Sequence, residues 1–264
     1  MPSVKIAEPI RIPDDAFIAG LDRDLAALGL GERLALIARI FGNAVFTTSL
    51  GIEDQVISWA VGVHAPSIRL ATLQTGRLFP ETVALIAETN ERFGLKIEEY
   101  QPAAADIEAY KGQYGLNGFY DSIEARHACC NFRKVKPLKR ALAGADAWIT
   151  GLRRSQSDNR AHVPFAEWDE ANGLVKLNPL ADWTVDDMKA AVAANDIPVN
   201  PLHARGYPSI GCEPCTRAIR PGEPERAGRW WWENDEKREC GLHVPEASPL
   251  PHASALPEGA ASKI

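Results

Sequence analysis

Five cysteines are the residues of this chain whose types and spacing could support chemistry. Cys129 and Cys130 are adjacent near the middle of the sequence, and Cys212 and Cys215 follow much later with C-x-x-C spacing. Two thiolates on one tight turn can reach the same ion, so these two distant pairs could together hold one metal centre. The fifth cysteine, Cys240, lies outside this pattern and is the candidate nucleophile.

The adjacency of the first pair bears on the kind of metal. A zinc ribbon prefers two spaced pairs of cysteines, whereas the side chains of Cys129 and Cys130 must diverge. Several iron atoms accommodate this divergence more easily than one tetrahedral ion, and four cysteines match the thiolate count of a cubane cluster. The pattern favours iron–sulfur over zinc, with ordinary buried thiols as the third interpretation. Lys134 could balance a negative cluster and contact an anionic substrate, or it could be a surface lysine of a basic helix.

The surroundings of Cys240 are basic. Residues 237–243 read Lys-Arg-Glu-Cys-Gly-Leu-His, and nearby cations favour the reactive thiolate whereas Glu239 opposes it. A position close to a mobile terminus suits a thiol that visits an active site and then a partner; an exposed thiol without a role is the alternative. Upstream, Arg226 and Arg229 would converge on one anion if their segment is helical. The tryptophans at 230–232 predict a packed platform, although one of them could stack on a base.

The totals limit the class of protein. With 264 residues, 45% of them hydrophobic and 24% charged, the chain can bury a core of one large domain or two small ones. It lacks an apolar run near the roughly 20 residues that span a bilayer, and its first residues lack the apolar core of a signal peptide. We therefore expect a cytoplasmic protein without a membrane partner, in which cysteines serve metal binding or catalysis. The net charge of -6 argues against a nucleic-acid partner but permits a small anion held by local cations.

Alternating strands and helices predict an α/β fold with a parallel sheet and right-handed crossovers. We expect strands at 44–48, 68–73, 95–100 and 147–150, and a hairpin over 168–178 that turns at Asn172-Gly173. We expect helices over 14–41 (two, covering the sheet), 52–59, 80–93, 103–114, 135–142 and 184–195. The segment 198–224 should be irregular, and 244–264 should form a mobile tail.

In such sheets ligands bind beyond the carboxyl ends of the strands, where the turns 49–54 and 74–77 would lie. The strand, glycine turn and helix over 44–59 would point backbone N–H groups at a phosphate, although such a turn can also simply connect two elements.

Four motifs then resemble one family. They are Cys129-Cys130 with Lys134, Gly-Cys-Glu-Pro-Cys-Thr-Arg at 211–217, Gly-Arg-Trp-Trp-Trp-Glu at 228–233, and Glu-Cys-Gly-Leu-His at 239–243. Together they resemble the assimilatory adenylylsulfate (APS) reductases of the phosphoadenylylsulfate (PAPS) reductase family, over roughly 44–243. The resemblance implies an adenine-nucleotide α-hydrolase-like (Rossmann-like) fold with helices on both faces, a [4Fe–4S] cluster, and thioredoxin or a glutaredoxin-like protein as reductant.

The resemblance also implies an organisation and a reaction. The catalytic domain would span 44–243, with a mobile catalytic segment at 235–243. We expect residues 1–43 to be a helical segment packing on this core, and the protein to be a homo-oligomer. The Cys240 thiolate would attack the sulfur of APS, releasing AMP and leaving an S-sulfocysteine that thioredoxin resolves to sulfite. This reaction belongs to assimilatory sulfate reduction and cysteine biosynthesis.

Site residues carry over position by position. The cluster ligands would be Cys129, Cys130, Cys212 and Cys215. The phosphosulfate would contact Lys134, Arg160, Arg226 and Arg229, with His243 nearby, and the turns around the nucleotide would supply Glu53, Asp54, Thr75 and Arg77. The family's first phosphate turn is often rich in serine, whereas Leu50 interrupts it here and leaves backbone contacts.

Alternatives differ in substrate and class. Some cluster-bearing members of the family accept both nucleotides, so a PAPS or dual reductase is the first alternative. An ATP-pyrophosphatase that adenylates a substrate would share the fold, but it usually carries a Ser-Gly-Gly-x-Asp-Ser type of turn and has no need for Cys240. A non-catalytic iron–sulfur or zinc sensor predicts that Cys240→Ser leaves all function intact. Because a two-electron thiol scheme needs no redox-active metal, an electrostatic and structural role through Lys134 is expected for the cluster.

Overall fold

The computed structural model describes residues 14–233, so Cys240 and His243 lie outside the described part of the chain. Its centre is a six-stranded sheet in the order β3-β2-β1-β4-β6-β5. The strands are β1 (Ala44–Thr48), β2 (Arg69–Leu73), β3 (Ile97–Tyr100), β4 (Ala147–Ile149), β5 (Ala166–Asp169) and β6 (Leu174–Leu177). All neighbouring pairs of this sheet are parallel except β5 with β6, which form the predicted antiparallel hairpin.

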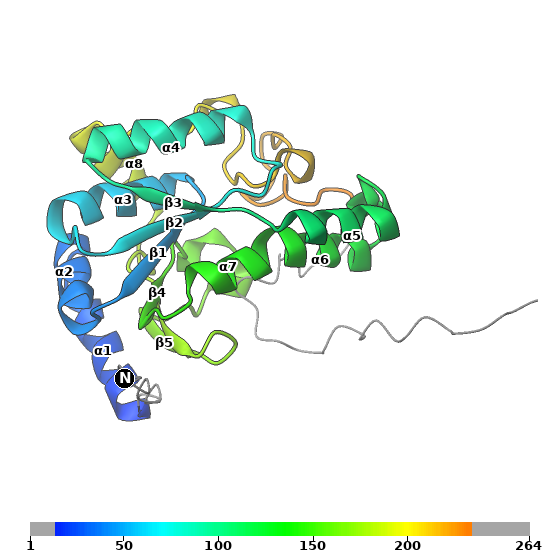
Figure 1. Cartoon of the computed structure of the whole chain (residues 1–264). Helices are drawn as coiled ribbons and strands as arrows, with labels where there is room; N and C mark the ends of the chain where they lie inside the picture. Colours follow the sequence, from blue (N-terminus) through cyan, green and yellow to red (C-terminus); the bar gives the residue numbers. More distant parts are fainter. Residues whose placement is uncertain (1–13, 234–264) are drawn as a thin grey trace, which may run out of the picture.

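Helices cover both faces of the sheet, as predicted (Figure 1). They are α1 (Asp15–Ala26), α2 (Leu30–Ile40), α3 (Ile52–His64), α4 (Pro80–Phe93), α5 (Ala104–Tyr114), α6 (Ile123–Cys130), α7 (Lys136–Ala141) and α8 (Val185–Asn195). Side chains of α1, α2, α3 and α4 join one face of the sheet in the main apolar core. Helix α7 covers the opposite face with a smaller core.

Strand β1 shows how the sequence builds these two layers. Successive side chains of a strand point to opposite faces, and Val45 lies in the core under α7 while Phe46 lies in the main core. Both are completely buried. A strand buried on both faces is typically a run of apolar and β-branched residues, and Ala44–Thr48 fits this pattern. Across residues 14–233, no helix combines the length and apolar character needed to cross a membrane.

Most predicted boundaries agree with the structure because local signals set them. Helix α4 begins at Pro80, which suits the first turn, and ends before Gly94, whose φ of 63° provides a left-handed cap. The hairpin turn contains Gly173 with φ 65°. The sequence did not predict α6, which starts after the Ser122 cap and carries the cysteine pair at its end. A π-helical turn (Asn131–Val135) joins α6 to α7, so the chain remains helical through the pair.

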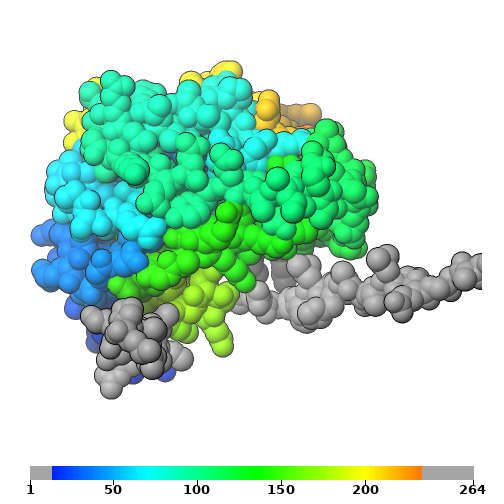
Figure 2. Space-filling model, in the orientation of Figure 1, coloured from blue at the N-terminus to red at the C-terminus, as the bar shows by residue number. Residues whose placement is uncertain are grey.

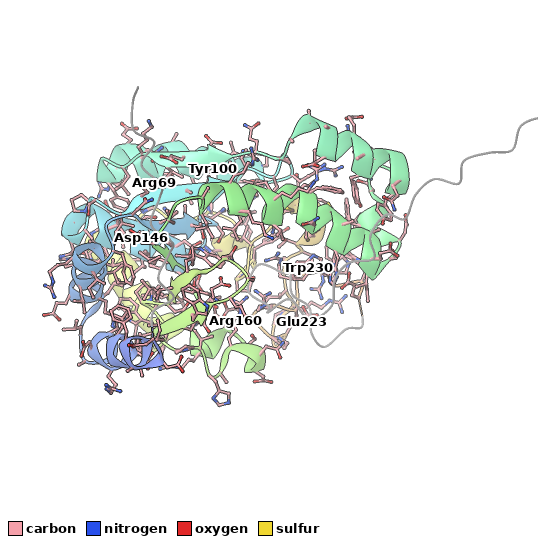
Figure 3. All side chains as sticks on the ribbon, turned by 60° about the horizontal axis from the view of Figure 1, so that its bottom comes forward. Arg69, Tyr100, Asp146, Arg160, Glu223 and Trp230 are labelled. Atoms are coloured by element: carbon pink, nitrogen blue, oxygen red, sulfur yellow. The ribbon has the colours of Figure 1, made fainter. Side chains whose placement is uncertain are left out.

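The strand order fixes where a ligand can bind. The chain moves from β1 outward through β2 and β3, and then returns to place β4 on the other side of β1. The turns after β1 and β4 therefore diverge and leave a crevice at the carboxyl ends of these strands. Arg160 and Trp230 lie at this end of the molecule, whereas Asp146, which precedes β4, lies at the opposite end (Figure 3).

Candidate active site

A cavity of about 190 Å³ occupies this crevice. Its wall is formed by the turns after β1, β2 and β4, the π-helical turn, and parts of the segments 208–211 and 225–230. The predicted substrate residues in this wall are Glu53, Asp54, Thr75, Lys134, Arg160, Arg226 and Arg229. Residues from distant parts of the sequence are thus gathered around one space large enough to admit a ligand.

The turn after β1 is held closed by Asp54. Its carboxylate accepts hydrogen bonds from the Ser49 backbone N–H at 2.5 Å and the Ser49 hydroxyl at 2.7 Å. Burial raises the pKa of Asp54 to about 7, although the two Ser49 hydrogen bonds act in the opposite direction. Helix α3 starts directly after Gly51, so its free backbone N–H groups and positive dipole end are at the cavity. This is the geometry of a phosphate site.

Leu50, which interrupts the expected serine-rich turn, has a structural function. Its backbone has φ 60°, in the left-handed region that a branched residue rarely adopts. Its side chain is 1% exposed and belongs to the main apolar core. The backbone conformation therefore costs energy that core burial offsets, and the turn contributes backbone groups to the cavity.

A hydrogen-bonded network forms the wall next to this turn. Arg153 donates from Nε at 3.0 Å and from Nη2 at 2.7 Å to Glu53 Oε1, and Gln156 donates to the same oxygen at 2.7 Å. Arg153 Nη2 also lies 3.2 Å from a carboxylate oxygen of Glu225. Arg160 donates to Gln156 Oε1 at 2.6 Å. Glu53 and Arg160, predicted as independent contacts, are thus linked by residues that sequence reasoning did not single out.

The cationic side of the cavity contains a buried guanidinium with an unused donor. Arg229 is 7% exposed, and its Nε is buried without a hydrogen-bond partner among residues 14–233. A side chain at Gly211 would overlap the Arg229 guanidinium, so the glycine makes room for it. Lys134 and Arg226 line the same cavity. Such an arrangement favours an anion, because hydrogen bonds from a guanidinium to an anion are strong.

Of the tryptophans at 230–232, for which a packed platform was predicted, Trp230 is packed as expected, whereas Trp231 is 39% exposed. Trp230 is 1% exposed, and the guanidiniums of Arg229 and Arg126 lie 4.6 Å and 4.8 Å from the centre of its ring. Its backbone N–H donates to the Cys215 carbonyl at 3.2 Å. These contacts tie the tryptophan to the cysteine region.

A second cavity of about 20 Å³ is lined by all four predicted metal ligands, Cys129, Cys130, Cys212 and Cys215. All four are buried free thiols. Lys134, Arg229 and Trp230 line both cavities, so the two spaces share a wall. Between residues 14 and 233, no group of three or more His, Cys, Asp or Glu side chains has the arrangement that holds a metal ion. The structure gathers the four cysteines but does not by itself show an iron–sulfur site.

The chemistry of the donor set fits a thiolate-ligated cluster. Burial raises the pKa of the Cys215 thiol to about 12 and also raises that of Cys129, so the thiols need a positive centre to ionise. Arg77, Arg126 and Arg133 line the same small cavity and would compensate the negative charge of such a cluster. The sulfur-only donor set suits soft metals and iron–sulfur clusters.

Residues of the turn after β2 contact the thiols or hold the side chains that do. The Thr75 hydroxyl lies 3.3 Å from Cys212 Sγ, and Arg133 Nη1 donates to the Thr75 carbonyl at 2.6 Å. Arg77 lines the cysteine cavity and not the larger one, and it donates to Asn117 Oδ1 at 3.2 Å and to the Leu116 carbonyl at 3.0 Å. The structure thus brings Arg77 to the cysteines, in contrast to its predicted place beside the nucleotide. Arg126 and Arg133 flank the cysteine pair in the sequence, and this closeness could have indicated that they line the cysteine cavity.

Comparison with known proteins agrees with this geometry. Residues 43–218 match the phosphoadenosine phosphosulfate reductase domain. Adenosine 5'-phosphosulfate reductase of Sinorhizobium fredii (strain USDA 257) is 65% identical over 243 residues, covering 91% of this chain and 97% of that protein. The enzyme of the same name from Rhizobium meliloti (strain 1021) is 68% identical over 232 residues, covering 87% of this chain and 88% of that protein.

A solved structure supports the fold. The crystal structure of phosphoadenylyl-sulfate (PAPS) reductase from Candida auris, a phosphate complex, matches with a TM-score of 0.68 at 27% identity. The match covers 78% of this chain and 98% of that one. The chain therefore belongs to the phosphoadenosine phosphosulfate reductase family, and its relatives at 65% and 68% identity are adenosine 5'-phosphosulfate reductases.

Proposed function

We propose that the protein reduces APS to sulfite and AMP. The observation that carries this proposal is the buried Arg229 guanidinium, whose Nε has no partner in residues 14–233 and which lies between the large cavity and the four thiols. Together with Lys134 it would bind the phosphosulfate at the junction of the two cavities. High identity to adenosine 5'-phosphosulfate reductases supports APS as the substrate.

The nucleotide would occupy the larger cavity. Its α-phosphate would approach the start of α3, and its sulfonate would lie among Lys134, Arg226 and Arg229. These cations would stabilise the charge that develops on the phosphate of AMP as it leaves. Because Arg229 is already held by the Trp230 ring, little reorganisation would be needed.

The chemical steps follow from covalent catalysis by Cys240. The Cys240 thiolate attacks the sulfur of APS, a sulfur–sulfur bond forms, and the bond from sulfur to the phosphate oxygen breaks so that AMP leaves with the electron pair. One thiolate of a thioredoxin or glutaredoxin-like dithiol then attacks Cys240 Sγ and releases sulfite. The second thiol of the reductant resolves the mixed disulfide, so the dithiol supplies both electrons and the Cys240 thiol is regenerated.

Cys129, Cys130, Cys212 and Cys215 would hold a [4Fe–4S] cluster. When bound, the cluster would supply a cross-link between α6 and the 212–215 turn and a negative charge beside the anion site. Lys134 lines both cavities, so it would balance that charge while binding the substrate. We further propose a homo-oligomer acting in cytoplasmic sulfate assimilation for cysteine biosynthesis.

Incubation of the purified full chain with APS in the absence of reductant tests the reaction. Intact-mass measurement should reveal the addition of one sulfonate, which thioredoxin removes and which Cys240→Ser does not form. A wild-type protein that gains no mass would overturn the mechanism. A second outcome, release of pyrophosphate from ATP by the same preparation, would instead indicate an adenylating enzyme.

PAPS is the alternative substrate, and the Candida auris relative named for it supports keeping it. The relatives at 65% and 68% identity are named for APS, which favours APS over PAPS. Turnover of the two nucleotides by one preparation discriminates between them. Equal or faster turnover of PAPS would contradict the assignment to APS.

A further inference from the structure

One buried ion pair connects the cysteine helix to the end of the described chain. Arg126 Nε donates to Glu233 Oε1 at 2.5 Å, although the two residues are 107 positions apart. Their side chains are 1% and 5% exposed. Removing two charges from water is costly, and such a pair is often no better for stability than apolar side chains. A role in fixing the relative position of two segments would explain why the charges are there.

The location of the pair connects it to both cavities. Arg126 lies on α6, one turn before Cys130, and lines the cysteine cavity. Glu233 ends the segment that contributes Arg226, Arg229 and Trp230 to the larger cavity. The Arg126 guanidinium also lies 4.8 Å from the centre of the Trp230 ring, and the Glu233 N–H donates to the Trp230 carbonyl at 3.0 Å. The pair thus closes a compact junction between the two segments.

The two segments that the pair joins are neighbours on the outline of the molecule. The α5–α6 region forms a shoulder beside the body of the sheet, and the orange end of the described chain lies next to it (Figure 2). The Tyr120 hydroxyl of this shoulder donates to the Pro214 carbonyl at 2.7 Å, which holds the cysteine turn against it. Position 233 is therefore tied to the scaffold that carries the four thiols.

The short stretch of chain between Glu233 and Cys240 links this attachment to catalysis. Cys240 follows Glu233 by seven positions, so an extended chain between them spans at most about 25 Å. Fixing Glu233 fixes the point from which the nucleophile must reach the cavity. Errors of about 1 Å in the approach of reacting groups can slow a reaction by about a hundredfold.

We propose that Arg126 and Glu233 are positioning residues, which fix the start of the Cys240 segment beside the substrate cavity and so set the rate of thiolate attack. The proposal rests on the proposed function, because it takes Cys240 as the nucleophile for APS. Arg126 shares α6 with two of the thiols, so the attachment point of the Cys240 segment lies on the same helix as the cysteine pair.

The test compares Glu233→Gln with Glu223→Gln in the full-length holoprotein. Glu223 belongs to the same segment, but its ion pair with Arg217 is partly exposed and its side chain is not part of either cavity wall. The measurements are the equilibrium Kd of APS, with reductant absent and Cys240 blocked by alkylation, and the single-turnover rate of sulfonate addition to the unblocked protein. Visible absorbance and melting temperature report whether each variant is folded and holds its metal.

Glu233→Gln should slow sulfonate addition at saturating APS about tenfold or more, while the Kd of APS changes less than about threefold. Glu223→Gln should match wild type in both measurements. Equal addition rates in wild type and Glu233→Gln, or a parallel loss of APS affinity, would overturn the proposal. If Glu233→Gln does not fold, Arg126→Lys serves as the second variant. It should likewise slow sulfonate addition while leaving the Kd of APS nearly unchanged.

The outcomes also separate this proposal from the proposed function. A wild-type protein that forms no adduct would overturn the APS mechanism itself. A wild-type protein that forms the adduct at the same rate as Glu233→Gln would overturn only the positioning role.

Discussion

The two adjoining cavities are completed in different ways. In the larger one, the acidic groups are already satisfied by the chain: Glu53 accepts from Arg153 and Gln156, and Asp54 accepts from Ser49. In the smaller one, four buried thiols face one another and a set of cations. A parallel sheet produces the first space through its topology, and a ligand needs only to enter it. The second has sulfur donors whose pKa values are raised by burial, so the proposed metal centre would favour their ionisation.

The strongest test of this contrast is Cys212→Ser. Loss of one thiolate from the smaller cavity should abolish the visible absorbance of a [4Fe–4S] cluster, because the hydroxyl is a poor substitute for a thiolate ligand. The visible absorbance spectrum and the iron content of freshly purified protein measure the loss of the cluster. Cys240→Ser is the matched control and should keep both. A colourless wild type with stoichiometric zinc would show that the donor set holds the other metal.

The second prediction concerns the wall that the cavities share. Arg229→Gln should weaken APS binding about ten- to a hundredfold, because a charge-assisted hydrogen bond contributes about 1.5–3 kcal/mol. Isothermal titration with APS measures this affinity. Lys139→Ala removes an exposed cation from α7 and should leave the affinity within about twofold. Similar losses of APS affinity in both variants would indicate long-range electrostatic attraction rather than a specific anion-binding site at Arg229.

The third prediction tests how tightly the β1 and β4 turns fit together. A methyl group at Gly151 would overlap Asp54 Oδ1, so Gly151→Ala should displace the carboxylate that closes the Ser49 turn. We expect a loss of about 1–3 kcal/mol in the free energy of unfolding and weaker APS binding. Chemical denaturation and titration measure the two effects. Gly112→Ala, in an exposed position of α5 with no atom near the added methyl, should instead stabilise by about 1 kcal/mol.

The smallest effect concerns the pH dependence of the larger cavity. The pKa of Asp54 is raised from 3.8 to about 7 by burial, so the folded state holds a proton that the unfolded state releases. The resulting contribution to stability is complete below pH 3.8 and is lost as pH rises through about 7. Asp54→Asn removes this dependence, so the free energy of unfolding of the variant relative to wild type should rise as the pH increases from 4 to 8.5.

Urea unfolding at pH 4, 5.5, 7 and 8.5 measures this difference. Asp187→Asn is the control of opposite sign: hydrogen bonds from Thr184 lower the pKa of Asp187, so ionisation of that carboxyl favours the folded state as pH rises. If the free energies of unfolding of Asp54→Asn and wild type differ by the same amount at every pH, Asp54 is not protonated in the folded protein.

The sequence by itself determined the local elements and the residue types of the site. Apolar runs located β1 and β2, Pro80 and Gly94 bounded α4, and the spacing of the cysteines marked the four donors before any contact was known. These features could be predicted because periodicity, caps and turn residues act over a few positions. The helix α6 was missed because its eight residues lack a clear apolar stripe.

Only the tertiary structure decided which side chains meet. Arg153 pairs with Glu53 across 100 positions, Arg126 pairs with Glu233 across 107, and Arg77 faces the cysteines rather than the larger cavity. Leu50 likewise points into the core. Such pairings depend on the crossing of β4 to the far side of β1 and on the path of irregular segments, which no local pattern encodes. The cysteines could therefore be named from the sequence, whereas the contacts that join them to the substrate cavity could not.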